Sequence, residues 1–166
     1  AWVYAFPGET VVESQPTVLD GRLFIGTRAG AMLALDAHTG CEHWRVPTDA
    51  AVKGAVVLGR AGPRGRVIAV AGDIAGNVYA ADAASGQLLW RIKADPDPLA
   101  RIAGSVQLVA DSVLVPVSSL EEGAAIDPAY PCCSFRGALV RVDALTGAVI
   151  WRHHTIAEPA VPQGHN

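Results

Sequence analysis

Two adjacent cysteines, Cys132 and Cys133, are followed three residues later by Arg136. If the two thiols bond to each other, their flat, polarizable sulfur surface can stack on a planar aromatic ligand. Arg136 is permanently charged and can donate paired hydrogen bonds to a carboxylate or a quinone oxygen. The same residues also allow two buried free thiols, with Arg136 paired to Glu121 or Glu122. The residue types alone leave both interpretations open.

These residues lie in a segment that interrupts an internal repeat. Three segments align without gaps: Ala34–Trp44, Ala80–Trp90 and Arg141–Trp151. The positions that recur in one register are Asp36, Asp82 and Asp143; Thr39, Ser85 and Thr146; Gly40, Gly86 and Gly147; and Trp44, Trp90 and Trp151. The spacing is 46 residues from the first copy to the second and 61 to the third, so the third copy carries an insertion, within residues 118–136. Insertions inside a repeat usually form loops on one face, often the binding face.

Each copy has the pattern of short β-strands separated by turns. In the first copy we expect strands at Val18–Leu19, Arg22–Thr27, Ala31–Asp36 and His43–Val46. Asp20-Gly21 is a strong hairpin signal, because both residues readily adopt the positive φ of a type I′ turn. Four short antiparallel strands in 40–50 residues, with glycine and tryptophan markers, predict an all-β fold built of β-propeller blades.

The turn that recurs in each copy has a simple physical interpretation. The Asp36 carboxylate can accept hydrogen bonds from the turn amides, and Gly40 supplies the left-handed backbone position. The tryptophan that follows can fill the gap between neighbouring sheets. Ala34 and Ala80 leave room for such a ring, whereas the third copy has Arg141 there.

We therefore expect about three blades and the remnant of another, which is an arc of a larger, closed ring. Its exposed sheet edges need the remaining blades as partners. The expected propeller region is 1–154, with blades at 15–46, 54–93 and 104–153, a remnant at Trp2–Phe6, the insertion loop at 118–136 and an irregular C-terminal segment at 155–166.

The pattern Ala-x-Asp-x-x-Thr-Gly-x-x-x-Trp, matched throughout by Ala34–Trp44, resembles the tryptophan-docking motif of the quinoprotein dehydrogenases. The resemblance implies an eight-bladed propeller with pyrroloquinoline quinone (PQQ) at its hub. Ser85 and Arg141 depart from the motif, and we expect the second departure to weaken the docking of Trp151.

The stretch from Pro116-Val-Ser-Ser to Cys-Cys-Ser-Phe-Arg-Gly is most similar to polyvinyl-alcohol dehydrogenases and their relatives. This resemblance implies a disulfide between Cys132 and Cys133 against the quinone ring, with Arg136 contacting the cofactor. It also implies calcium, a carboxylate base, a secondary or polymeric alcohol as substrate, cytochrome c or an attached haem domain as electron acceptor, and a periplasmic or secreted location. The base and the calcium ligands are not identifiable in this chain, so we expect residues 1–166 to be inactive alone.

A second hypothesis is a propeller without a cofactor that binds protein partners, because outer-membrane assembly lipoproteins carry similar repeats. Such a scaffold has no need of a disulfide between adjacent cysteines. The oxidation state of Cys132 and Cys133 therefore separates the two hypotheses.

Composition excludes several other classes of protein. With 51% hydrophobic residues and a net charge of −3, the chain lacks the basic character of a nucleic-acid binder. Its apolar runs are far shorter than the roughly 20 residues of a membrane span. We expect no metal site from His38, His43 or the adjacent His153 and His154, and we expect Cys41 to be a buried small hydrophobic residue.

The insertion also carries carboxylates. Glu121, Glu122 and Asp127 lie there. A carboxylate in this loop could serve a calcium-bound quinone, but we expect ordinary solvation for all three.

Overall fold

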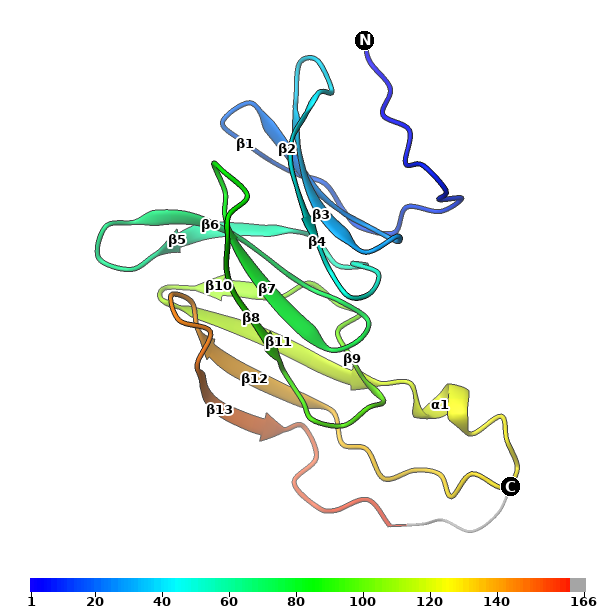
Figure 1. Ribbon diagram of the computed structural model, residues 1–166. Coiled ribbons are helices and arrows are strands. Elements are labelled where there is room, and N and C mark those ends of the chain that lie inside the picture. The colour runs from blue at the N-terminus through cyan, green and yellow to red at the C-terminus, as the bar shows by residue number, and fades with distance from the viewer. Residues whose placement is uncertain (162–166) are drawn as a thin grey trace.

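The computed structural model describes residues 1–161, which fold into three antiparallel sheets arranged one after another along the chain (Figure 1). The first sheet consists of β1 (Thr17–Leu19), β2 (Arg22–Thr27), β3 (Ala31–Asp36) and β4 (Glu42–Pro47). The second consists of β5 (Val57–Ala61), β6 (Arg66–Gly72), β7 (Asn77–Asp82) and β8 (Leu88–Lys93). The third consists of β10 (Gln107–Val109), β11 (Ser112–Ser119), β12 (Ala138–Asp143) and β13 (Val149–His154). Each sheet is a meander in chain order, so the predicted all-β fold of four-stranded antiparallel units is confirmed.

The strands of the first repeat lie where the sequence places them. β2 and β3 have the predicted bounds, and β1 and β4 are longer by a residue or two. Asp20 and Gly21 have φ values of 49° and 73°, which is the type I′ turn expected between β1 and β2.

Two elements of the third repeat were not predicted. The short strand β9 (Ala100–Arg101) pairs with Ser118–Ser119 at the end of β11. The single-turn helix α1 (Glu121–Ala124) follows directly. Ser118 and Ser119 lie beyond the last pair of β11 with β12, Val117 with Ala138, at the end of β11 where the insertion begins.

The core lies between the faces of successive sheets. One buried cluster joins the first and second sheets through residues such as Phe24 and Tyr79. A second cluster joins the second and third sheets and includes Ile68, Ile102 and Val140. Stacked sheets that share their apolar faces in this way are the construction principle of a propeller.

The repeated tryptophans connect each sheet to the next. The Nε1–H group of Trp2 donates to the carbonyl of Ala37 over 3.0 Å. Trp44 donates to Ala83 over 3.1 Å in the same way. The series continues with Trp90, which donates to the carbonyl of Ala144 over 2.9 Å. Trp44 and Trp90 are each only 8% exposed.

Each docked indole lies on the glycine of the next turn. A Cβ atom built on Gly86 would stand 2.6 Å from the Trp44 ring, and one on Gly147 would stand 2.9 Å from the Trp90 ring. Both glycines have positive φ, so the turn and the close approach of the ring require glycine for separate reasons.

Ala34 and Ala80 lie directly opposite Trp44 and Trp90 in their sheets, as expected from the room that they leave. The third sheet has Arg141 opposite Trp151. Trp151 is 38% exposed, and within residues 1–161 no further turn covers it.

The aspartate of each turn organises the backbone beside the glycine. Asp36 accepts hydrogen bonds from the amides of His38 and Thr39 and from the Thr39 hydroxyl. Asp82 and Asp143 repeat this arrangement. The serine that replaces threonine in the second copy therefore makes the same contacts.

These hydrogen bonds stabilise the ionised carboxylates. The Thr39 amide holds the pKa of Asp36 below its usual value, and the Thr146 hydroxyl does the same for the pKa of Asp143. At Asp82, burial raises the pKa, but the hydrogen bonds from the Ser85 amide and hydroxyl outweigh it and the net shift is downward.

Substitution of a docking glycine tests the interaction between sheets. Gly21 has a similar φ to Gly86 but nothing within 4 Å of a built Cβ, which makes it a matched control. Gly21→Ala and Gly86→Ala each cost about 1–2 kcal/mol of backbone strain. Gly86→Ala also forces the Trp44 ring to move, so we expect a further loss of about 1–3 kcal/mol in the free energy of unfolding. Urea unfolding followed by tryptophan fluorescence measures both, and equal losses would contradict the docking role.

Acid should weaken the turns. Because the folded-state pKa values of Asp36, Asp82 and Asp143 lie below the unfolded value near 3.9, their contribution is full above that pH and is lost as the pH falls through the folded values. We expect the urea midpoint to drop as the pH falls below about 4. The triple variant D36N/D82N/D143N should be less stable near neutral pH and show a flatter acid dependence; an unchanged slope would contradict this.

Candidate functional site

The insertion lies on one face of the stacked sheets, here called the insertion face. In a four-stranded meander, alternate turns fall at opposite ends of the strands. The β2–β3 and β6–β7 turns and the long β11–β12 connection therefore share one end, and the docking turns with their tryptophans share the other. In Figure 1 the insertion with α1 extends from the third sheet at the end away from the β12–β13 turn.

Cys132 and Cys133 form a disulfide with each other, across a cis peptide bond. Cys132 is half-buried and Cys133 is exposed, so one side of the disulfide faces out of the protein. The alternative of two free thiols is not what the structure contains.

Arg136 does not pair with Glu121 or Glu122 in the described part of the chain. It is half-buried, and its Nη1 donates to the carbonyl of Ala157 over 2.7 Å. This bond ties the end of the insertion to the segment after β13.

Glu121 organises the loop around the cysteines. Its carboxylate accepts hydrogen bonds from the amides of Ser134 and Phe135, each over 2.7 Å, and from the hydroxyl of Tyr130 over 2.9 Å. Burial raises the pKa of Glu121, but the amide hydrogen bonds outweigh it and the net shift is downward. The expectation of a solvated Glu121 was wrong, because the chain folds back over 13 residues to surround it. No sequence motif shows such a closure, whereas the neighbouring Glu122 is exposed as expected.

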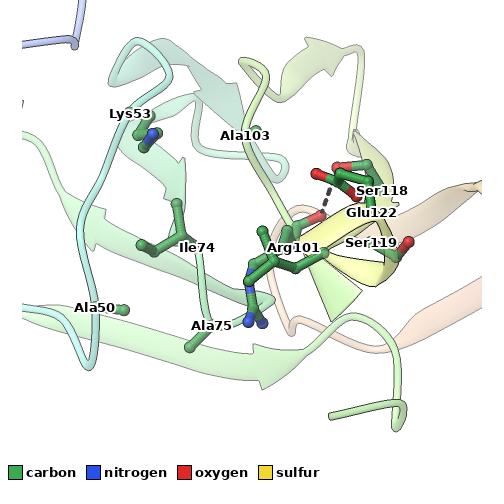
Figure 2. Close-up of a pocket in the computed structure, with 10 residues that line it drawn as sticks. Ala50, Lys53, Ile74, Ala75, Arg101, Ala103, Ser118, Ser119 and Glu122 are labelled. Atoms are coloured by element: carbon green, nitrogen blue, oxygen red, sulfur yellow. Dashed lines mark hydrogen bonds between the residues drawn. The ribbon is translucent and has the colours of Figure 1, made fainter. Parts of the chain in front are cut away.

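A cavity of about 480 Å³ lies on the same face, beside α1. Ala50 from the β4–β5 connection and Ile74 and Ala75 from the β6–β7 turn lie on one side of it (Figure 2). The serines at the end of β11 and Glu122 of α1 lie on the other side. The lining residues are Ala50, Lys53, Ile74, Ala75, Arg101, Ala103, Ser118, Ser119, Leu120 and Glu122. Neither cysteine nor Arg136 is among them, so the cavity and the disulfide are separate features of the insertion face.

Buried hydrogen bonds hold the wall of this cavity in place. Asp73 is fully buried and accepts hydrogen bonds from Asn77 and from the Tyr79 hydroxyl. The amide of Ile74 donates to the carbonyl of Ala51, which links the β6–β7 turn to the β4–β5 connection. The site is therefore positioned by the sheets rather than by the loop alone.

The cations at the cavity already have protein partners. Lys53 pairs with Glu13 over 3.1 Å. Arg101 donates to the carbonyls of Pro98 and Ala100.

Residues 1–161 contain no group of three or more histidine, cysteine, aspartate or glutamate side chains placed to hold a metal ion. Cys41 is an exposed free thiol, so the expectation of a buried residue was wrong; it lies just beyond Gly40, where the turn faces solvent. No helix within the described residues is long and apolar enough to cross a membrane.

Comparison with known proteins places the chain in a family. The PQQ_2 family model, described as outer membrane protein assembly factor BamB, matches residues 3–163. Two proteins named polyvinylalcohol dehydrogenase, from Sphingopyxis sp. (strain 113P3) and Pseudomonas sp, are each 35% identical to the chain over 97% of its length. The chain spans only 25% of the length of each.

A solved structure agrees with the fold. The quinohemoprotein alcohol dehydrogenase from Comamonas testosteroni superimposes with a TM-score of 0.63 and 23% identity, over 88% of this chain and 21% of that one. At this identity the match supports the fold alone. The chain therefore belongs to the PQQ_2 family, and the resemblance to quinoprotein alcohol dehydrogenases that its sequence carries is confirmed.

Proposed function

We propose that this chain is part of a PQQ-dependent dehydrogenase that oxidises secondary or polymeric alcohols and passes the electrons to cytochrome c or an attached haem domain. The observation that carries the proposal is the Cys132–Cys133 disulfide, which lies in the insertion and is followed by Arg136. The 35% identity to proteins named polyvinylalcohol dehydrogenase, across nearly the whole chain, supports it.

The residues of the insertion face fit a planar, multiply charged anion such as PQQ. The disulfide offers a flat polarizable surface, and Arg136 has guanidinium donors left for a carboxylate or quinone oxygen. Arg101 also carries a positive charge on this face, at the cavity, whereas the charge of Lys53 is paired with Glu13. When bound, the quinone supplies the two-electron oxidation, and this part of the chain binds and orients it.

The base and the calcium ion are assigned to other parts of the protein. The resemblance implies both, but residues 1–161 hold no cluster of candidate metal ligands. The chain alone should therefore bind the cofactor incompletely and turn over no alcohol.

The cavity beside α1 supports an alcohol with an aliphatic chain as substrate. Ile74, Ala75 and Leu120 give it apolar wall, while Ser118, Ser119 and charged side chains can pair with hydroxyl groups (Figure 2). A polymer that alternates methylene and hydroxyl-bearing carbons matches both kinds of surface.

The family description favours a second candidate, a scaffold in outer-membrane protein assembly. The disulfide argues for the enzyme, because a protein-binding scaffold makes no evident use of it. The same bond supports a periplasmic or secreted location, since disulfides persist in oxidising compartments.

Cofactor binding tests the proposal. In the full-length protein with PQQ and Ca²⁺, we expect a secondary alcohol to reduce an artificial electron-accepting dye. Arg136→Ala removes a charged donor, so it should raise the Kd for PQQ by about tenfold or more. Arg64→Ala, an exposed arginine in the β5–β6 turn on the opposite face, is the matched control and should change nothing.

The dehydrogenase proposal fails if the wild-type protein reduces no dye. It fails equally if mass spectrometry after alkylation without reductant finds free thiols at Cys132 and Cys133.

Substrate preference tests the role of the cavity. Ile74→Asn puts an amide on the apolar wall, so we expect the KM for polyvinyl alcohol to rise about fivefold while kcat/KM for a small secondary alcohol changes less than twofold. Leu88→Asn, an exposed residue at the start of β8, serves as control. Equal effects on both alcohols would contradict a polymer-binding role.

A further inference from the structure

Glu121 is a buried carboxylate that has no ion-pair partner among the described residues. It is 4% exposed, and the salt bridges of residues 1–161 do not include it. Burying a charge is costly unless hydrogen bonds replace its hydration. The contacts of Glu121 show which part of the loop its buried carboxylate holds in place.

The hydrogen bonds to Glu121 bracket the disulfide. Tyr130, two residues before Cys132, donates to Oε1 over 2.9 Å. Ser134, the residue after Cys133, donates its amide to Oε1 over 2.7 Å and its hydroxyl over 3.3 Å. Phe135 donates its amide to Oε2 over 2.7 Å. Each carboxylate oxygen thus holds one amide of the backbone that leaves the disulfide.

Glu121 is itself fixed to the sheet. Its amide donates to the Ser119 hydroxyl at the end of β11, and Leu120 donates to the carbonyl of Leu99. On the far side, Phe135 packs against the core between the second and third sheets. The carboxylate is therefore the link between a rigid strand and a disulfide that lies in an otherwise irregular loop.

We propose that Glu121 is the positioning residue of the cofactor site: its carboxylate sets the orientation of the Cys132–Cys133 disulfide for the quinone. This inference rests on the proposed function. Glu121 does not contact the cofactor and takes no part in the oxidation. It keeps the sulfur surface in one orientation before the quinone binds. The free energy of binding is therefore not reduced by the entropy of ordering the loop.

The test compares Glu121→Gln with Glu42→Gln in the full-length protein. The first change keeps the size of the side chain but places an NH₂ group against a backbone amide. The second alters an exposed glutamate at the start of β4, which also accepts a hydrogen bond from a tyrosine hydroxyl but lies outside the insertion and the cavity. We expect Glu121→Gln to raise the Kd for PQQ, measured by equilibrium dialysis, by about tenfold, or about 1.4 kcal/mol. Glu42→Gln should stay within twofold of wild type.

A second readout needs no cofactor. In the absence of PQQ, reduction of the disulfide by a phosphine followed by thiol labelling and mass spectrometry reports how firmly Cys132 and Cys133 are held. We expect labelling in Glu121→Gln to be several times faster than in wild type and in Glu42→Gln. A role confined to overall stability would lower the Tm of Glu121→Gln without changing either the labelling rate below the transition or the Kd.

The outcomes separate this inference from the proposed function. Unchanged Kd and labelling rate in a folded Glu121→Gln protein overturn the positioning role. If that variant does not fold, Tyr130→Phe removes one bond to Oε1 and must shift both measurements in the same direction by a smaller factor; no shift overturns the role. If wild type binds no PQQ, the proposed function fails, and the labelling rates still decide whether Glu121 holds the disulfide.

Discussion

The contact between a tryptophan and the glycine of the next repeat is the constraint on which the rest of the structure depends. The indole donates to a carbonyl beside the turn aspartate and lies on a glycine that tolerates both the ring and a positive φ. The contact is repeated at each junction, so it sets the spacing and rotation between sheets. The insertion face is formed by loops from three sheets, so it depends on these contacts between sheets.

The site shows a division of labour between sheets and insertion. The sheets bring the β6–β7 turn and the β4–β5 connection together, and buried groups such as Asp73 hold the turn in place. The insertion adds the disulfide, the arginine and a helix of one turn, and it is anchored at one carboxylate, Glu121. A stable scaffold with a variable loop is the usual way in which propeller families change function without changing fold.

The two functional hypotheses share the scaffold and differ only in the insertion. The docking repeats carry no information on catalysis, since they serve packing alone. The disulfide does carry such information, because a flat sulfur surface held at the rim of a ligand face serves a planar partner. This is why a family model described as an outer membrane protein assembly factor and relatives named as dehydrogenases can both match one chain.

The sequence by itself determined the strands, the turns and the docking pattern, because these depend on residues close together in the chain. Asp20-Gly21, the turn aspartates and Ala34 opposite Trp44 are all local signals or fixed register relations. The pairing of the two cysteines was expected from the family resemblance rather than from their spacing. The tertiary structure alone decided the rest. It buried Glu121 and exposed Cys41, it gave Arg136 the carbonyl of Ala157, and it formed β9 against β11. Each of these depends on how an irregular segment packs against residues distant in the chain. Hydrophobic periodicity and turn residues report only local structure, so they do not specify that packing.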